Sequence, residues 1–265
     1  MADDDRTLPD QTQVQQLQSV LTAQQEELFQ LVLSRDDRVL SLLLKNPHLT
    51  EDHLLALLKR RDLSEALLSS IYRRHKGNLS NRLIRALAKN PVTPGAIMRN
   101  LLPHLLLFEL LDFCFMPGVT ADQRIAAERT ILQRLPTTPL GSKMTLARRG
   151  TAAVVGTILK EGDPKLVEIC LNSPRLAEAA VFQFINGPRA AASTLSMIAR
   201  NGRWKNRPNL QLAILKNRLT PTIWFNLWIP TLPVRTINQL LANRRLAPAQ
   251  RKAIQDELSR RKTSH

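Results

Sequence analysis

Apolar residues recur at helical spacing ahead of a short motif that returns along the chain. They lie two, three and six or seven positions before four asparagines, which are Asn46, Asn90, Asn172 and Asn217. A face of this spacing is typical of an amphipathic helix. We expect each asparagine to close its helix, and the proline that follows nearby to prevent the helix from continuing.

The motif returns at a spacing near 43 residues. The same position in each copy is expected to open the next helix, and the residues at this position are Thr50, Thr93, Thr138, Ala177 and Thr220. Threonine is a favoured N-cap and proline a favoured first helical residue, so we expect these roles for the threonines and for Pro94, Pro139 and Pro221. A third helix follows within the repeats, and its candidate starts are at Ser64, Pro103, Pro188 and Pro233. Residues 120–123 resemble a capping box that opens another helix, with Thr120 as its N-cap.

Helices this short cannot bury an apolar stripe alone, so the repeats must stack on one another. The pattern predicts an all-α fold, a right-handed α-α superhelix (solenoid) of about five three-helix repeats of roughly 43 residues. We assign residues 34–250 to this repeat domain. Residues 251–265 form the basic end of a C-terminal helix that begins near Pro248 and frays from Arg260.

Residues 1–33 form an acidic, glutamine-rich N-terminal segment. We expect residues 1–12 to be disordered because they are polar. Residues 13–33 are expected to form a capping helix, with one apolar side made of Val14, Leu17, Leu21, Leu28 and Leu31.

Composition supports helices over strands. The chain has 47 leucines but only 11 aromatic residues and nine glycines, a balance that disfavours a β-sandwich or barrel. Two cysteines, Cys114 and Cys170, are too few for a disulfide framework and fit a reducing compartment. The most apolar stretch, residues 101–116, is too short to cross a bilayer, and residues 1–5 are acidic where a secretory signal is basic. We therefore expect a soluble, cytoplasmic protein without a membrane span.

The positive charge is concentrated at the C-terminal end. The formal net charge is +16, yet residues 1–33 carry −5 and residues 200–265 carry +12. A field of this kind attracts polyanions such as nucleic acid, an acidic protein or an anionic membrane surface. The alternative is a solvated surface that only keeps the protein soluble.

The corner sequences at 45–50, 89–94 and 216–221 resemble those of bacterial α-helical repeat proteins of the HEAT, armadillo and leucine-rich-repeat-variant type. The resemblance covers about residues 34–250 and concerns the corners and their period. It implies a superhelix that serves as a binding scaffold, and it transfers no active site. The third repeat, where Gly141, Gly150, Gly156 and Gly162 cluster, departs from the regular pattern.

Motifs of catalysis are missing from the sequence. It contains no phosphate-binding loop, no dinucleotide fingerprint, no His-Glu-x-x-His or Cys-x-x-Cys pair and no nucleophile elbow. We interpret His48 and His53 as surface or capping residues, and Glu109 and Asp112 as the polar edge of a helix. The chain is therefore predicted not to be an enzyme, and to bind no metal and no small-molecule cofactor.

The best candidate binding segment is residues 200–207, where four cations surround Trp204. One hypothesis is that this segment binds a nucleic acid, with the four cations neutralising its phosphates and Trp204 stacking on an unpaired base. In the alternative, Trp204 is a buried anchor of the loop. If the corners of successive repeats align along one edge, further cations extend the site. The candidate polyanion-binding residues are Arg200, Arg203, Trp204, Lys205, Arg207, Lys216, Arg218, Arg244 and Arg245.

Three classes of function remain open. The first is a non-catalytic scaffold for protein–protein interaction, the usual role of extended repeat surfaces, with another protein as the partner. The second is nucleic-acid binding by the basic C-terminal repeats. The third is a HEAT-like DNA glycosylase, a class that uses a basic face with tryptophans near a carboxylate. The chain has three tryptophans, but Trp224 and Trp228 are four residues apart beside apolar neighbours, which favours packing.

Overall fold

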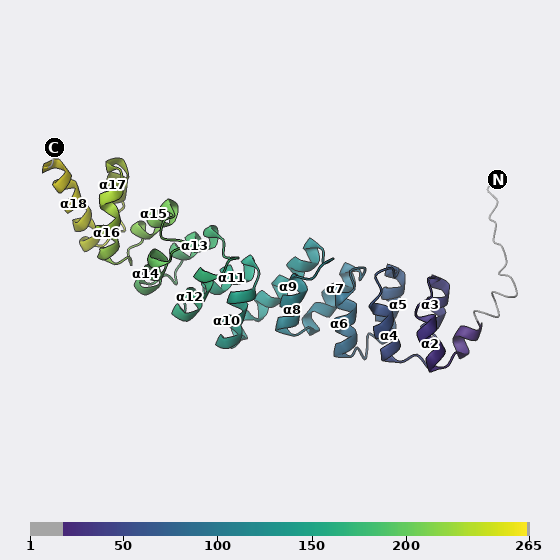
Figure 1. Cartoon of the computed structure of the whole chain (residues 1–265). Helices are drawn as coiled ribbons and strands as arrows, with labels where there is room; N and C mark the ends of the chain where they lie inside the picture. The colour runs from purple at the N-terminus through teal and green to yellow at the C-terminus, as the bar shows by residue number, and fades with distance from the viewer. Residues whose placement is uncertain (1–17, 264–265) are drawn as a thin grey trace, which may run out of the picture. The chain divides into compact units, whose positions relative to one another are not determined.

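The computed structural model describes residues 18–263, and every secondary-structure element in this range is helical, with no strand (Figure 1). The predicted all-α fold is confirmed. No helix of the described range is both long enough and apolar enough to traverse a bilayer.

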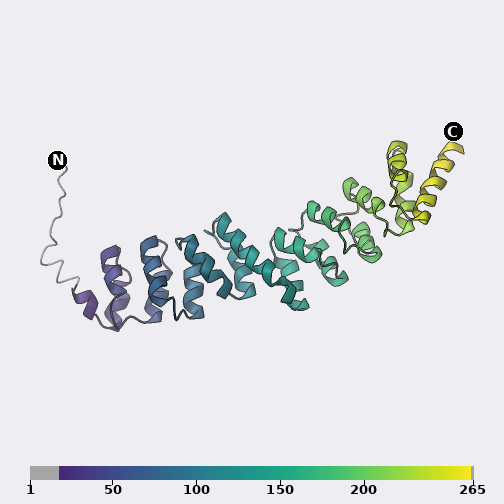
Figure 2. The ribbon, with the colours of Figure 1, turned by 180° about the vertical axis from the view of Figure 1, so that it is seen from behind.

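The chain divides into two compact units, Met1–Thr130 and Ile131–His265. Each unit is a succession of short helices joined by tight corners (Figure 1, Figure 2). The labelled helices that begin in the first unit are α2 (Gln25–Leu31), α3 (Asp37–Leu43), α4 (Glu51–Leu58), α5 (Glu65–His75), α6 (Asn81–Lys89), α7 (Gly95–Leu101), η1 (Leu102–His104), α8 (Leu107–Cys114) and α9 (Ala121–Arg134).

The second unit contains the end of α9 and a further series of helices. Its core near the C-terminus packs Leu215, Phe225, Ile229, Ile237 and Ile254 together. The helices are η2 (Leu135–Thr137), α10 (Leu140–Arg149), α11 (Ala152–Leu159), α12 (Pro164–Asn172), α13 (Glu178–Ile185), α14 (Ala192–Arg200), α15 (Pro208–Lys216), α16 (Thr222–Trp228), η3 (Ile229–Thr231), α17 (Val234–Leu241) and α18 (Pro248–Thr263).

Within each unit, a helix packs mainly against the helix two places along the chain. In the second unit α10 packs on α12, α13 on α15, and α16 on α18; in the first, α4 packs on α6. The repeated motif that contains these asparagines and threonines, which we call the corner motif, precedes α4, α7, α10, α13 and α16. It therefore returns at every third helix, as the sequence predicts. Because packing alternates every second helix while the motif returns every third, successive copies of the motif do not occupy equivalent places.

The threonines of the corner close the preceding helix and do not cap the next one. The Thr93 hydroxyl donates to the Leu87 carbonyl at 2.6 Å, and the N-cap of α7 is Pro94. Thr138 and Thr220 do the same for α9 and α15. The expected N-cap role is therefore wrong for these three, and each proline lies one place before its expected position. Thr50 is the N-cap of α4, as predicted. The backbone N–H of Thr50 donates to Nδ1 of the buried His53 at 3.1 Å.

The corner asparagines tie each corner to the corner two helices earlier. The Asn90 amide donates to the carbonyls of Leu58 and Arg60 at 3.0 and 2.7 Å, and its oxygen accepts from the Val92 N–H at 3.0 Å. Asn46 and Asn217 make the same kinds of bond. One short side chain thus satisfies carbonyls that the end of a helix leaves without partners.

Some expected helix ends differ from the structure. Thr120 and Gln123 form the predicted capping box of α9, and Ser64 caps α5. The predicted starts at Pro103 and Pro188 are wrong, because a 3₁₀ turn occupies 102–104 and a non-helical corner precedes α14.

The two ends of the chain also differ from the expectation. The expected helix 13–33 is interrupted at residues 23–24, and the predicted positions before residue 18, Val14 and Leu17 among them, lie outside the described residues. At the other end, α18 continues to Thr263, so the expected fraying from Arg260 is wrong for the part of the tail that the structure describes.

Candidate functional site

Trp204 is a buried anchor of the 200–207 corner. Its side chain is 2% exposed, and the indole N–H donates to the Leu171 carbonyl at 2.9 Å. A base needs an open aromatic face for stacking, so the hypothesis that Trp204 stacks on an unpaired base is wrong. The alternative interpretation, a loop anchor, holds for this residue.

Arg203 also has a structural role. Its guanidinium lies over the Trp204 ring, 4.4 Å from the ring centroid, and donates to the carbonyls of Ser173, Pro174 and Leu176 at 2.6, 3.3 and 3.0 Å. These carbonyls belong to the α12–α13 corner, two helices earlier. Three donors of this exposed side chain are therefore bound to the protein's own backbone, which gives Arg203 a structural role.

The other cations of this corner are divided between protein contacts and solvent. Arg207 forms an ion pair with Glu178 at 3.8 Å, and the Arg200 guanidinium lies 5.9 Å from the Trp224 ring centroid. Lys205 is exposed and forms no ion pair within the described part of the chain. Trp224 itself is buried and donates to Ser196 Oγ at 3.0 Å, while its ring packs on Trp228 at 5.2 Å. The packing role predicted for Trp224 and Trp228 is confirmed.

The candidate cations do not share one edge of the second unit. Arg203 ties the 200–207 corner to the α12–α13 corner. By contrast, Asn243 donates to the Lys216 carbonyl at 3.2 Å, which joins the α17–α18 corner to the α15–α16 corner. Corners that follow odd-numbered helices thus meet one another, and so do corners that follow even-numbered helices. The single ridge expected from the sequence is wrong, because helices pack on their second neighbours.

We call three consecutive odd corners the basic edge: residues 186–191, 216–221 and 242–247. Asn217 Nδ2 joins the first two by donating to the Ile185 carbonyl at 2.7 Å, and Gln250 joins the last two by donating to Thr220 O at 2.7 Å. The basic edge holds five exposed cations, namely Arg189, Lys216, Arg218, Arg244 and Arg245.

The basic edge itself carries no carboxylate, and the acidic residues Glu161 and Asp163 belong to the adjoining corner, whose Gly162 lies against Arg189. The three corners contain no aspartate or glutamate, and α14, α16 and α18 begin there without an acidic residue in the first turn. None of the five side chains forms an ion pair with a described residue. Sequence reasoning found four of them and missed Arg189, which follows Pro188 in a corner of the same kind.

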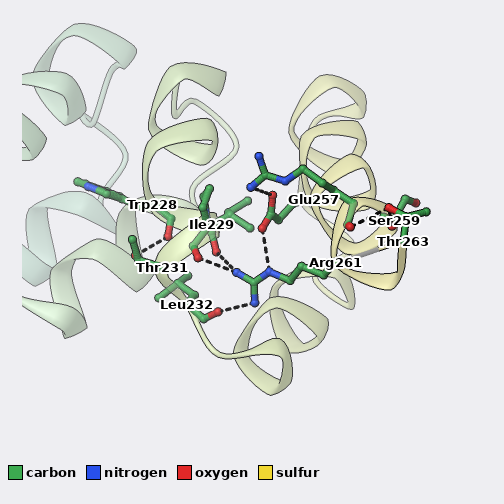
Figure 3. Close-up of polar contacts among 10 residues, drawn as sticks. Trp228, Ile229, Thr231, Leu232, Glu257, Ser259, Arg261 and Thr263 are labelled. Carbon is green, nitrogen blue, oxygen red and sulfur yellow. Dashed lines mark hydrogen bonds and ion pairs between the residues drawn. The ribbon is translucent and has the colours of Figure 1, made fainter. Parts of the chain in front are cut away.

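The opposite corners use arginines to bind backbone carbonyls. Arg261 donates to the carbonyls of Leu232, Ile229 and Pro230 at 3.0, 3.1 and 2.8 Å, and its Nε donates to Glu257 at 2.8 Å (Figure 3). Arg60 in the first unit binds the carbonyls of Val32 and Ser34 in the same way. Part of the large positive charge therefore stabilises helix ends. The cations of the basic edge have no such role.

A groove of about 600 Å³ lies between α13 and α15. Its apolar lining residues are Phe182, Leu212 and two alanines. Phe182 is 46% exposed. The full lining is Glu178, Ala179, Phe182, Gln183, Asn186, Asn209, Leu212, Ala213 and Lys216. The groove ends at Lys216, so it adjoins the basic edge.

The described residues contain no cluster of metal ligands. No three His, Cys, Asp or Glu side chains lie together as they would in a metal site within residues 18–263. Burial raises the pKa of Cys114 to about 11 and that of Cys170 to about 12, so both thiols are protonated at neutral pH. Glu109 pairs with Arg85 at 3.2 Å and accepts from the Leu106 N–H. Comparison of the chain with protein-family models, with characterised proteins and with solved structures finds no match.

Proposed function

We propose that the protein is a non-catalytic binding scaffold in which stacked helices form a right-handed α-α superhelix, and that its basic edge binds the phosphate backbone of a nucleic acid. The observation that carries this proposal is the set of five exposed cations on three adjoining corners without a carboxylate among them. Unopposed cations attract a polyanion and release its counterions on binding.

A nucleic acid fits this edge better than a broad anionic surface does. The cations lie along a row of corners, and helices that pack on one another are about 8–10 Å apart. A row of this kind matches the line of phosphates along a strand. Four of the five cations are arginines, whose planar guanidinium forms paired hydrogen bonds with phosphate oxygens.

The test is the salt dependence of binding to defined oligonucleotides. Replacing Arg218, Arg244 and Arg245 with glutamine should reduce the slope of log affinity against log salt by about 2 for a single strand. A matched control removes the same charge from exposed positions of the first unit, with Arg38, Arg61 and Arg74 replaced by glutamine. Equal losses for the two triple variants would mean that net charge, and not the basic edge, drives binding.

A second candidate function, binding of a protein partner, is favoured by the outer face of α16. Ile223 and Leu227 lie four residues apart on this helix and are 54% and 55% exposed. Exposed apolar pairs of this kind are typical of contact surfaces. Capture of a partner from nuclease-treated lysate, lost when both residues are replaced by serine, would support this function. Capture that disappears with nuclease would favour the nucleic acid.

A further inference from the structure

The groove between α13 and α15 combines an open aromatic ring with amide side chains. Phe182 is the exposed aromatic residue of the groove, while Gln183, Asn186 and Asn209 line it with polar groups. The Asn186 amide donates to the Phe182 carbonyl at 2.9 Å, which leaves its oxygen available as an acceptor. Neither Gln183 nor Asn209 has a side-chain hydrogen bond in the described structure.

These groups match the chemistry of a nucleobase. A base offers a flat face that stacks on an aromatic ring and an edge with both donors and acceptors. Amides supply both types of group at once, because each carries a carbonyl oxygen and an NH₂. A volume of about 600 Å³ lies within the usual range for small-ligand sites of about 300–1,000 Å³.

The charges beside the groove indicate where the phosphate of a bound nucleotide would lie. Lys216 belongs both to the groove lining and to the basic edge, so a base in the groove brings its own phosphate to that edge. The carboxylate of the groove, Glu178, lies one helical turn before Phe182 on α13, and the ion pair with Arg207 at 3.8 Å offsets its charge. The groove therefore has a paired carboxylate at one end and the cation of Lys216 at the end that adjoins the basic edge.

We propose that this groove binds an unpaired base of a single-stranded nucleic acid whose phosphates lie on the basic edge. This inference rests on the proposed function and adds to it a preference for single strands over duplexes. Phe182 takes the stacking role that the sequence suggested for Trp204. In a duplex the bases are stacked on one another, so only an unpaired base offers its face to Phe182.

The experiment compares Phe182→Ala with the unmodified protein on a single strand of about twelve nucleotides and on the matching duplex. Single-strand affinity should fall between about fivefold and about 150-fold, the range for loss of one base–aromatic stack, while duplex affinity stays the same. Phe182→Trp should retain single-strand binding. Phe108→Ala, which removes a 37% exposed phenylalanine from the first unit, is the matched control.

A second readout detects the stack itself. A strand that carries 2-aminopurine should lose fluorescence when that base stacks in the groove, and Phe182→Ala should restore the signal. Circular dichroism of each variant checks that the helices are intact. If Phe182→Ala binds both forms as the unmodified protein does, or weakens both equally, the groove does not take a base. In that case a salt-dependent affinity still supports the basic edge. If no nucleic acid binds, both proposals are wrong.

Discussion

Gln250 joins the α18 helix to the α15–α16 corner, and its replacement should destabilise the second unit. Its side chain is 2% exposed, and Nε2 donates to the carbonyls of Asn217, Arg218 and Thr220 at 3.3, 3.1 and 2.7 Å. Oε1 accepts from the Ala247 N–H at 2.9 Å. The bond to Thr220 is buried, whereas the others lie closer to solvent, where water can replace the lost partner.

The magnitude follows from the groups left without partners. A buried acceptor that loses its donor costs about 1–3 kcal/mol, and the partly buried groups add less, so Gln250→Met should lower the free energy of unfolding by about 2–4 kcal/mol. Gln250→Glu has nearly the same shape but puts a carboxylate against three carbonyl oxygens. At neutral pH it should therefore cost more than methionine.

The glutamate variant should also acquire a characteristic pH dependence. Burial and the facing carbonyls should raise the pKa of the introduced carboxyl above its unfolded value of about 4.3. A raised pKa means that stability is greatest at low pH and is lost as pH rises through the folded pKa. Acidification should therefore restore part of the lost stability of Gln250→Glu.

Urea unfolding followed by tryptophan fluorescence measures this effect, because all three tryptophans lie in the second unit. Gln255→Glu introduces the same charge at an exposed position of α18 and serves as the control. Equal midpoints for the two glutamate variants at neutral pH would refute the carbonyl-binding role of Gln250. The same conclusion would follow if Gln250→Met were as stable as the unmodified protein.

Two further predictions concern the first unit. Thr93→Val should lower the free energy of unfolding by about 1 kcal/mol, because the Leu87 carbonyl loses the hydroxyl but keeps the Asn90 N–H, whereas Leu87→Ala should cost about 2–5 kcal/mol. Urea unfolding by circular dichroism measures both, and unchanged midpoints would contradict these contacts. The Arg60 guanidinium lowers the pKa of Asp62 from 3.8 to about 2, so this pair stabilises the fold above pH 3.8 and the contribution is lost as pH falls towards 2. Arg60→Met should return the pKa of Asp62 towards 3.8 in an NMR titration, and an unchanged value would exclude the pairing.

The corner motif shows which features of the structure can be predicted from local sequence patterns. Asn90 and Thr93 were identified as the residues that turn the chain, and the Thr120 capping box was predicted from its spacing. The sequence could not tell which helix Thr93 serves. A threonine between two helices can bond to the N–H groups ahead or to the carbonyls behind, and the backbone of the corner decides between them.

Trp204 and Phe182 show the same limit for the candidate site. A tryptophan among four cations suggests a stacking platform, whereas no sequence pattern singles out Phe182. Burial reverses the expectation for Trp204, which fills the corner beneath Arg203, while Phe182 is exposed on α13, in the groove beside α15. Exposure depends on the neighbouring helix, which no local spacing specifies.

The sequence by itself determined the helical class, the return of the corner motif at every third helix and the concentration of charge near the C-terminus. Only the tertiary structure decided which cations are free. Arg203 and Arg261 donate to carbonyls that a helix two places earlier leaves without partners, whereas the exposed side chains of Arg218 and Arg244 form no such bond in the described structure. The distinction is not local, because each helix packs on its second neighbour and so divides the corners between two edges. A guanidinium is the same group on either edge, and the carbonyls around it determine its role.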